Sequence, residues 1–160
     1  MKKVLVSACL MGKKVRYDGN ALPQESQAFQ RLTQLADIVT FCPEVAGGLP
    51  TPRPPAEINV ADGDLVIAGK GKVISVNAID VTHQFALGAQ KTLDLCRQQN
   101  IEIAVLTESS PSCGSSLIYS GEFAGRKVPG HGVTTALLRQ HGIKVFSQFT
   151  VEDALAELEL

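Results

Sequence analysis

Three of the four cysteines in this chain lie shortly after apolar runs that predict buried β-strands. The cysteines and the runs before them are Cys9 after 4–8, Cys42 after 38–41, and Cys113 six residues beyond 101–107. In an open parallel α/β sheet the carboxyl ends of the strands line one edge, so residues far apart in the sequence can meet in the crevice there. We therefore expect the three thiols to converge, and three converging thiols suggest a metal site.

The spacing of the cysteines leaves their chemistry open. The chain has no Cys-x-x-Cys pair, so it supports neither a zinc ribbon nor a dithiol redox motif. A lone cysteine nucleophile would need a histidine partner, and of His83, His131 and His141 only His131 stands in a loop expected to face the crevice. The fourth cysteine, Cys96, belongs to the apolar stripe of a predicted helix, and we expect it to be a core residue.

The loops that hold Cys42 and Cys113 carry further polar groups. Glu44 stands two residues beyond Cys42, and Pro43 restricts the turn between them. In the other loop three hydroxyls precede the thiol, and Gly114 lets the backbone turn tightly after it. These hydroxyls belong to Ser109, Ser110 and Ser112.

Strands and helices are expected to alternate along most of the chain. The expected strands are 3–8, 37–41, 101–107 and 143–147, and the expected helices are 24–36, 80–99, 133–140 and a last one from 151. This alternation is typical of an α/β fold with helices on both faces of the sheet. We expect one three-layer, Rossmann-like domain over 1–160 with a mainly parallel sheet.

A short region between the second and third strands breaks the alternation. The segment 43–56 contains five prolines, which argues against a helix or an interior strand and favours an ordered loop over the strand ends. Residues 57–68 alternate around Asp62-Gly63, a strong hairpin signal, and 72–76 predicts another short strand. We therefore expect a small β-hairpin insertion, followed much later by a Gly-rich loop at 121–132.

The composition excludes several classes of protein. With 160 residues, 44% of them hydrophobic, the chain can bury a core without disulfides. Its net charge of −1 argues against nonspecific nucleic-acid binding. The apolar run that follows the N-terminal lysines is about five residues, too short for a signal peptide, and no run approaches a membrane helix. We expect a cytoplasmic protein with reduced thiols and with neither a nucleic-acid nor a membrane partner.

Motifs from nearly the whole chain together resemble a bacterial family long filed as a domain of unknown function, the thiouracil desulfidase family. The motifs are Val6-Ser7-Ala8-Cys9-Leu10 with Tyr17-Asp18-Gly19, Cys42-Pro43-Glu44 with Gly47-Gly48-Leu49, Pro52-Arg53-Pro54-Pro55-Ala56-Glu57, Asp80-Val81-Thr82, Ser110-Pro111-Ser112-Cys113-Gly114, and Pro129-Gly130-x-Gly132-Val133-Thr134 before Ala136-Leu137-Leu138. The family often has an acidic residue where this chain has His131, which argues against an essential histidine.

The resemblance implies a [4Fe-4S] cluster held by three cysteines, which map onto Cys9, Cys42 and Cys113. Such clusters usually have four thiolate ligands. A cluster with three keeps one iron open, and an open, thiophilic iron is a Lewis acid suited to a substrate's sulfur. Electron transfer would favour the closed arrangement.

This chemistry leads to a mechanistic hypothesis. The expected substrate is a small thiolated nucleobase or nucleoside, such as 2-thiouracil, 4-thiouracil or 4-thiouridine, from which water displaces sulfur to give the oxo-pyrimidine and hydrogen sulfide without net redox change. Glu44 is expected to shuttle the protons as general base and then acid. A hydroxyl of Ser110 or Ser112 is expected to orient the substrate, although either serine can instead serve the turn.

Two alternatives to a desulfidase remain open at this stage. One is a cluster-free enzyme with Cys42 or Cys113 as nucleophile, and the other is a sensing module whose metal is structural. Outside the cysteine loops, Arg53 and Glu57 are expected to form a salt bridge that pins the proline-rich segment, and Lys127 can either attract an anionic ligand or solvate a loop.

Overall fold

Apolar side chains that alternate between two faces explain the central sheet. The computed structural model describes residues 1–59 and 62–160. Its sheet has four strands in the order β2-β1-β5-β8, all paired in parallel. The strands are β1 (Lys3–Ser7), β2 (Asp37–Phe41), β5 (Ile103–Leu106) and β8 (Lys144–Ser147). Along β1, Val4 and Val6 face one apolar cluster and Leu5 faces the other.

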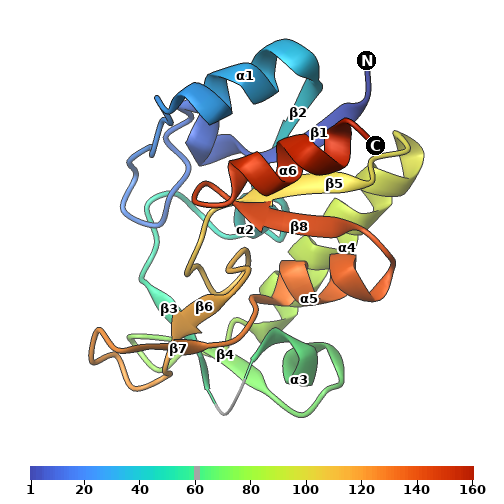
Figure 1. Ribbon diagram of the computed structural model, residues 1–160. Coiled ribbons are helices and arrows are strands. Elements are labelled where there is room, and N and C mark those ends of the chain that lie inside the picture. The colour runs from blue at the N-terminus through green and yellow to red at the C-terminus, as the bar shows by residue number, and fades with distance from the viewer. Residues whose placement is uncertain (60–61) are drawn as a thin grey trace.

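Two helices cover each face of this sheet (Figure 1). Val4 and Val6 pack with α1 (Gln27–Leu35) and α6 (Val151–Leu158), whereas Leu5 packs with α4 (Thr82–Gln98) and α5 (Val133–Gln140). The predicted three-layer α/β fold with a mainly parallel sheet is confirmed. Cys96 lies in the α4 cluster at 1% exposure, as expected for a core residue.

The insertion is an antiparallel pair, β3 (Ala56–Asn59) and β4 (Lys72–Ser75), which confirms the hairpin. The predicted turn at Asp62-Gly63 is wrong, because the short helix α3 (Gly63–Ile67) connects the two strands. Asp62 caps this helix by accepting a hydrogen bond from the backbone N–H of Asp64. Residues 60–61, within the predicted hairpin, lie outside the described residues.

The structure also contains elements that were not predicted. The one-turn helix α2 (Pro43–Ala46) begins the proline-rich segment, so the expectation that no helix forms there is wrong. Pro43 fits the first turn of a helix, where its missing N–H would have no partner in any case. A hairpin of β6 (Leu117–Tyr119) and β7 (Lys127–Pro129) flanks part of the predicted Gly-rich loop.

The helix α2 lies directly against α4. A Cβ added at Gly88 would lie 2.0 Å from the carbonyl oxygen of Pro43, and one added at Gly47 would lie 1.9 Å from the carbonyl oxygen of Gln84. The two glycines therefore let the backbones touch, and this contact positions the segment that carries Cys42 and Glu44.

No helix in the described part of the chain is long and apolar enough to cross a membrane.

Candidate active site

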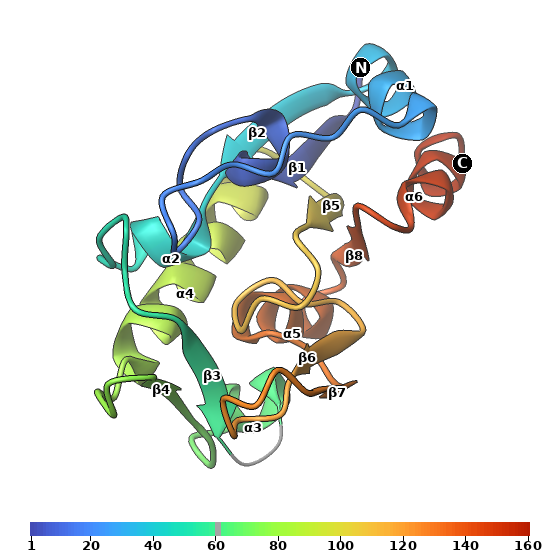
Figure 2. The same cartoon turned by 90° about the vertical axis from the view of Figure 1, so that its left-hand side faces the viewer.

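The three cysteines that were predicted to converge line one large cavity. Figure 2 looks toward the carboxyl ends of the sheet strands, from which the relevant loops leave. Cys9 lies in the 3-10 helix η1 (Ala8–Met11) after β1, Cys42 lies between β2 and α2, and Cys113 lies in the loop after β5. Because β1 is the middle strand of these three, the thiols come from adjacent strand ends. All three line a cavity of about 780 Å³.

The spread of these thiols fits a cluster better than a single zinc ion. Among the described residues, no set of three ligand atoms within 4.8 Å of one another contains these sulfur atoms. A tetrahedral zinc ion with Zn–S bonds of about 2.3 Å would hold its sulfurs about 3.8 Å apart. At least two of the three sulfur atoms therefore lie farther apart than a single zinc ion would hold them, and three soft sulfur ligands spread in this way suit an iron–sulfur cluster.

The electrostatic surroundings argue against any of these cysteines as a free nucleophile. Burial raises the pKa of the Cys9, Cys42 and Cys113 thiols. At Cys113 the negative charges of Glu44 and of the other two thiolates raise the pKa further. A nucleophilic cysteine needs a lowered pKa or an adjacent base, whereas coordination to a metal removes the thiol proton outright.

The histidines do not supply that base. None of the three lines the cavity. His131, which we expected to face the crevice, instead places Nδ1 3.1 Å from Oδ2 of Asp64 in α3. Its carbonyl oxygen also accepts a hydrogen bond from Gly63, which ties the 129–132 segment to the insertion rather than to the cavity.

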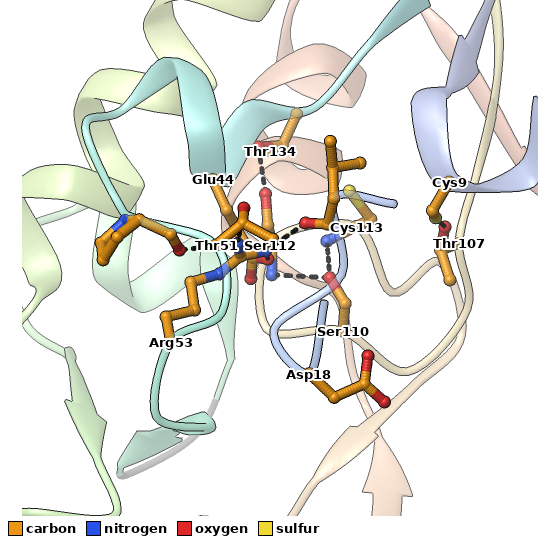
Figure 3. A network of polar contacts seen from close by, with 12 residues as sticks. Cys9, Asp18, Glu44, Thr51, Arg53, Thr107, Ser110, Ser112, Cys113 and Thr134 are labelled. Atoms are coloured by element: carbon orange, nitrogen blue, oxygen red, sulfur yellow. Dashed lines mark hydrogen bonds and ion pairs between the residues drawn. The ribbon is translucent and has the colours of Figure 1, made fainter. Parts of the chain in front are cut away.

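Glu44 lies in the first turn of α2, lines the cavity and forms a largely buried ion pair. Its Oε2 accepts a hydrogen bond from Nη2 of Arg53 at 2.5 Å, with side-chain exposures of 16% for Glu44 and 4% for Arg53 (Figure 3). The guanidinium also donates to the backbone carbonyls of Pro50 and Val15. Backbone carbonyls thus hold the Arg53 guanidinium, and the guanidinium in turn holds the Glu44 carboxylate in place.

The predicted salt bridge between Arg53 and Glu57 is wrong. Glu57 stands on β3, and its Oε1 accepts hydrogen bonds from the backbone N–H groups of Gly121 and Phe123. Arg53 precedes the strand and folds back toward α2. Nearness in sequence was misleading because each side chain has its partner in another segment.

The two candidate serines have different surroundings. Ser110 lines the cavity, and its Oγ accepts hydrogen bonds from the backbone N–H groups of Ser112 and Cys113. Ser112 is only 1% exposed, does not line the cavity, and shares a hydrogen bond of 2.7 Å with Oγ1 of Thr134. Ser110 is therefore the serine that can reach a ligand, and Ser112 joins its loop to α5.

Glu108 anchors the Cys113 loop, a role that the sequence analysis missed. Its Oε1 accepts four backbone N–H bonds, and its Oε2 accepts the hydroxyls of Ser115 and Ser116; the backbone donors are Ser109, Ser115, Ser116 and Leu117. Burial alone would raise the pKa of Glu108, but these hydrogen bonds outweigh it and lower the pKa to about 2.

Thr107, just before Glu108, was also missed. Its Oγ1 lies 2.8 Å from Sγ of Cys9 in a buried contact (Figure 3). Thr107 and Glu108 directly follow β5, at the same sheet edge as the cysteines. Polar residues that follow a buried parallel strand face the crevice, so the pair Thr107-Glu108 carried a signal that could have identified them.

Comparisons with known proteins agree with this geometry. A family model described as 2-thiouracil desulfurase matches residues 4–149. The protein YbbK of Bacillus subtilis (strain 168), described as uncharacterized, is 42% identical over 152 residues, which cover 95% of this chain and 99% of that protein. A solved structure named [4Fe-4S]-dependent thiouracil desulfidase TudS is 46% identical, with a TM-score of 0.88 over 100% of both chains. The chain belongs to the 2-thiouracil desulfurase family.

Proposed function

We propose that this protein is a [4Fe-4S]-dependent desulfidase that converts a thiolated pyrimidine to the oxo-pyrimidine and hydrogen sulfide. The carrying observation is that three thiols from adjacent strand ends, together with Glu44, line one cavity. Family membership and the similarity to a protein named as such a desulfidase support the proposal. The substrates we propose are 2-thiouracil, 4-thiouracil and 4-thiouridine.

In this proposal Cys9, Cys42 and Cys113 hold the cluster. Cys96 is excluded, because it is buried in the α4 core and does not line the cavity. A cluster held by these three thiolates would keep one iron without a protein ligand and would supply a Lewis acid for the substrate's sulfur. Apolar side chains line the cavity and limit the access of bulk water, among them Leu49 of the proline-rich segment and, at the start of α4, Val81 and Phe85.

Glu44 moves the protons in this scheme. Arg53 engages Oε2, so we assign to Oε1 the proton of the attacking water and its later return to the leaving sulfur. The ion pair fixes the direction of the carboxylate, which is what a group that transfers protons to defined atoms requires.

Ser110 orients the substrate. Its oxygen already accepts two backbone N–H bonds, and a hydroxyl in this state still has one O–H to donate. We assign that donor to the carbonyl oxygen or a ring nitrogen of the pyrimidine. The backbone bonds hold Oγ at the wall of the cavity, so the donor is placed before the substrate arrives.

The test is purification without oxygen, followed by iron and sulfide quantitation and by incubation with 2-thiouracil. We expect about four irons and four sulfides per chain and release of sulfide. Cys9→Ala, Cys42→Ala and Cys113→Ala should each lose iron, whereas the matched control Cys96→Ala should keep it. Activity that survives complete iron removal would indicate a thiol enzyme, and iron without turnover would indicate a sensing module; either result refutes the proposal.

A further inference from the structure

The Cys9 thiol lies against a hydroxyl from another segment of the chain, that of Thr107. Thr107 is 7% exposed, and its Oγ1 lies 2.8 Å from Sγ of Cys9. Both residues line the cavity. They come from segments 98 residues apart that the sheet brings together.

Backbone contacts hold Thr107 beside the end of β1. The N–H of Thr107 donates to Oγ of Ser7 at 2.9 Å, and Ser7, at the end of β1, is only 3% exposed. Strands β1 and β5 are paired in register just before this point, with Val6 opposite Val105. Strand pairing therefore brings the backbone of Thr107 next to Cys9, within reach of its hydroxyl.

The direction of the hydrogen bond depends on the state of the sulfur. A thiolate carries no proton, so next to a thiolate the hydroxyl of Thr107 can only donate. Donation draws electron density from the sulfur, and hydrogen bonds to ligand sulfurs are among the factors that set the potential of an iron–sulfur cluster. Groups that hydrogen-bond to a metal ligand also fix the orientation of that ligand.

We propose that Thr107 is a positioning residue that donates a hydrogen bond to the Cys9 thiolate and thereby makes the bound cluster more electron-poor. The inference rests on the proposed function, because it takes Cys9 as a cluster ligand. Its consequence for the reaction is a stronger Lewis acid at the iron that receives the substrate's sulfur, obtained without a change in the ligand set.

The test compares the anaerobically prepared wild type with Thr107→Val, which keeps the branched shape but lacks the hydroxyl, and with Thr107→Ser, which keeps the hydroxyl. We expect the midpoint potential of the Val variant to be more negative than that of the wild type, and its iron–thiolate stretching bands in resonance Raman spectra to move to higher frequency. The Ser variant should restore both readouts. Sulfide release by the Val variant should fall about tenfold.

A matched control removes a buried hydroxyl elsewhere. Thr92 in α4 is 0% exposed and donates to the carbonyl oxygen of Gly88, so Thr92→Val should leave the potential unchanged. If the Val variant of Thr107 does not retain the cluster, Thr107→Ala replaces it in the comparison with Thr107→Ser.

The outcomes separate this inference from the function on which it rests. A wild type that binds no iron would overturn both. A wild type with about four irons, combined with the same potential and Raman bands in the hydroxyl-lacking variant, would overturn the inference alone. Equal shifts in the Ser and Val variants would also overturn it, because they would show an effect of packing.

Discussion

Replacing Glu108 by Gln tests how the Cys113 loop is held. Lowering the pKa of a carboxyl from its ordinary 4.5 to about 2 corresponds to about 3 kcal/mol of preferential stabilisation of the carboxylate. Glu108 is half-buried, and solvent screens part of this interaction, so we expect Glu108→Gln to lower the free energy of unfolding by about 2 kcal/mol at pH 7. Urea denaturation followed by circular dichroism measures this change.

The effect has a defined pH dependence. The folded-state pKa of Glu108 is depressed, so its stabilisation is fully present above about pH 4.5 and is lost as the pH falls toward 2. The difference between the wild type and the variant should shrink over the same interval. Hydrogen exchange should quicken at the four backbone amides that donate to the carboxylate, those of Ser109, Ser115, Ser116 and Leu117.

A matched control separates this network from a general effect of charge. Glu102 is exposed, and Glu102→Gln should change the free energy of unfolding by less than about 0.5 kcal/mol. A Glu108→Gln variant that matches this control, or whose deficit stays constant from pH 7 to pH 3, would refute the view that the carboxylate anchors the loop.

Three further substitutions probe the cavity and its support. Arg53→Ala leaves the Glu44 carboxylate without its partner and should cost about 3 kcal/mol of unfolding free energy in urea together with most of the sulfide release; wild-type turnover would remove the ion pair from the mechanism. Gly88→Ala places a Cβ 2.0 Å from the Pro43 carbonyl oxygen and should cost about 2 kcal/mol in the same assay, with a loss of bound iron; an unchanged iron content would contradict the proposed role of the contact. Burial raises the pKa of Cys96 to about 11, so this thiol should resist alkylation at pH 8 in the native protein and react after unfolding, whereas fast native labelling would show that α4 is not packed as described.

Much of the fold could be predicted because its signals are local. The parallel strands are short apolar runs, and their flanking helices carry apolar residues at helical spacing. Each element can therefore be recognised from a short stretch of sequence. The convergence of Cys9, Cys42 and Cys113 on one cavity followed from one topological rule about strand ends. The role of the three thiols as cluster ligands stays a prediction.

The errors came where one local signal had two structural solutions. Asp followed by Gly favours a hairpin turn, yet Asp62 also makes a good helix cap, and the longer connection between β3 and β4 selected the cap. Prolines argue against helices except at the first turn, and Pro43 occupies that exception.

The partners of polar side chains could not be predicted, because they depend on how the fold brings distant segments together. The partner of Arg53 is Glu44 and not the nearer Glu57, and the hydroxyl of Ser112 points to α5 while that of Ser110 borders the cavity. A pattern of residue types shows that a loop is rich in polar groups. It does not show which of them the fold turns inward.

The touching backbones at Gly47 and Gly88 determine how freely this site can vary. Where side chains set the distance between two helices, exchanging one residue for a larger one shifts the helices by a fraction of an ångström, and the site moves with them. Here main-chain atoms set that distance, so apolar exchanges elsewhere on α4 leave the placement of Cys42 and Glu44 largely untouched. Most positions around the site should therefore tolerate substitution. The sensitivity to mutation is confined to the two glycines, which have no side chain.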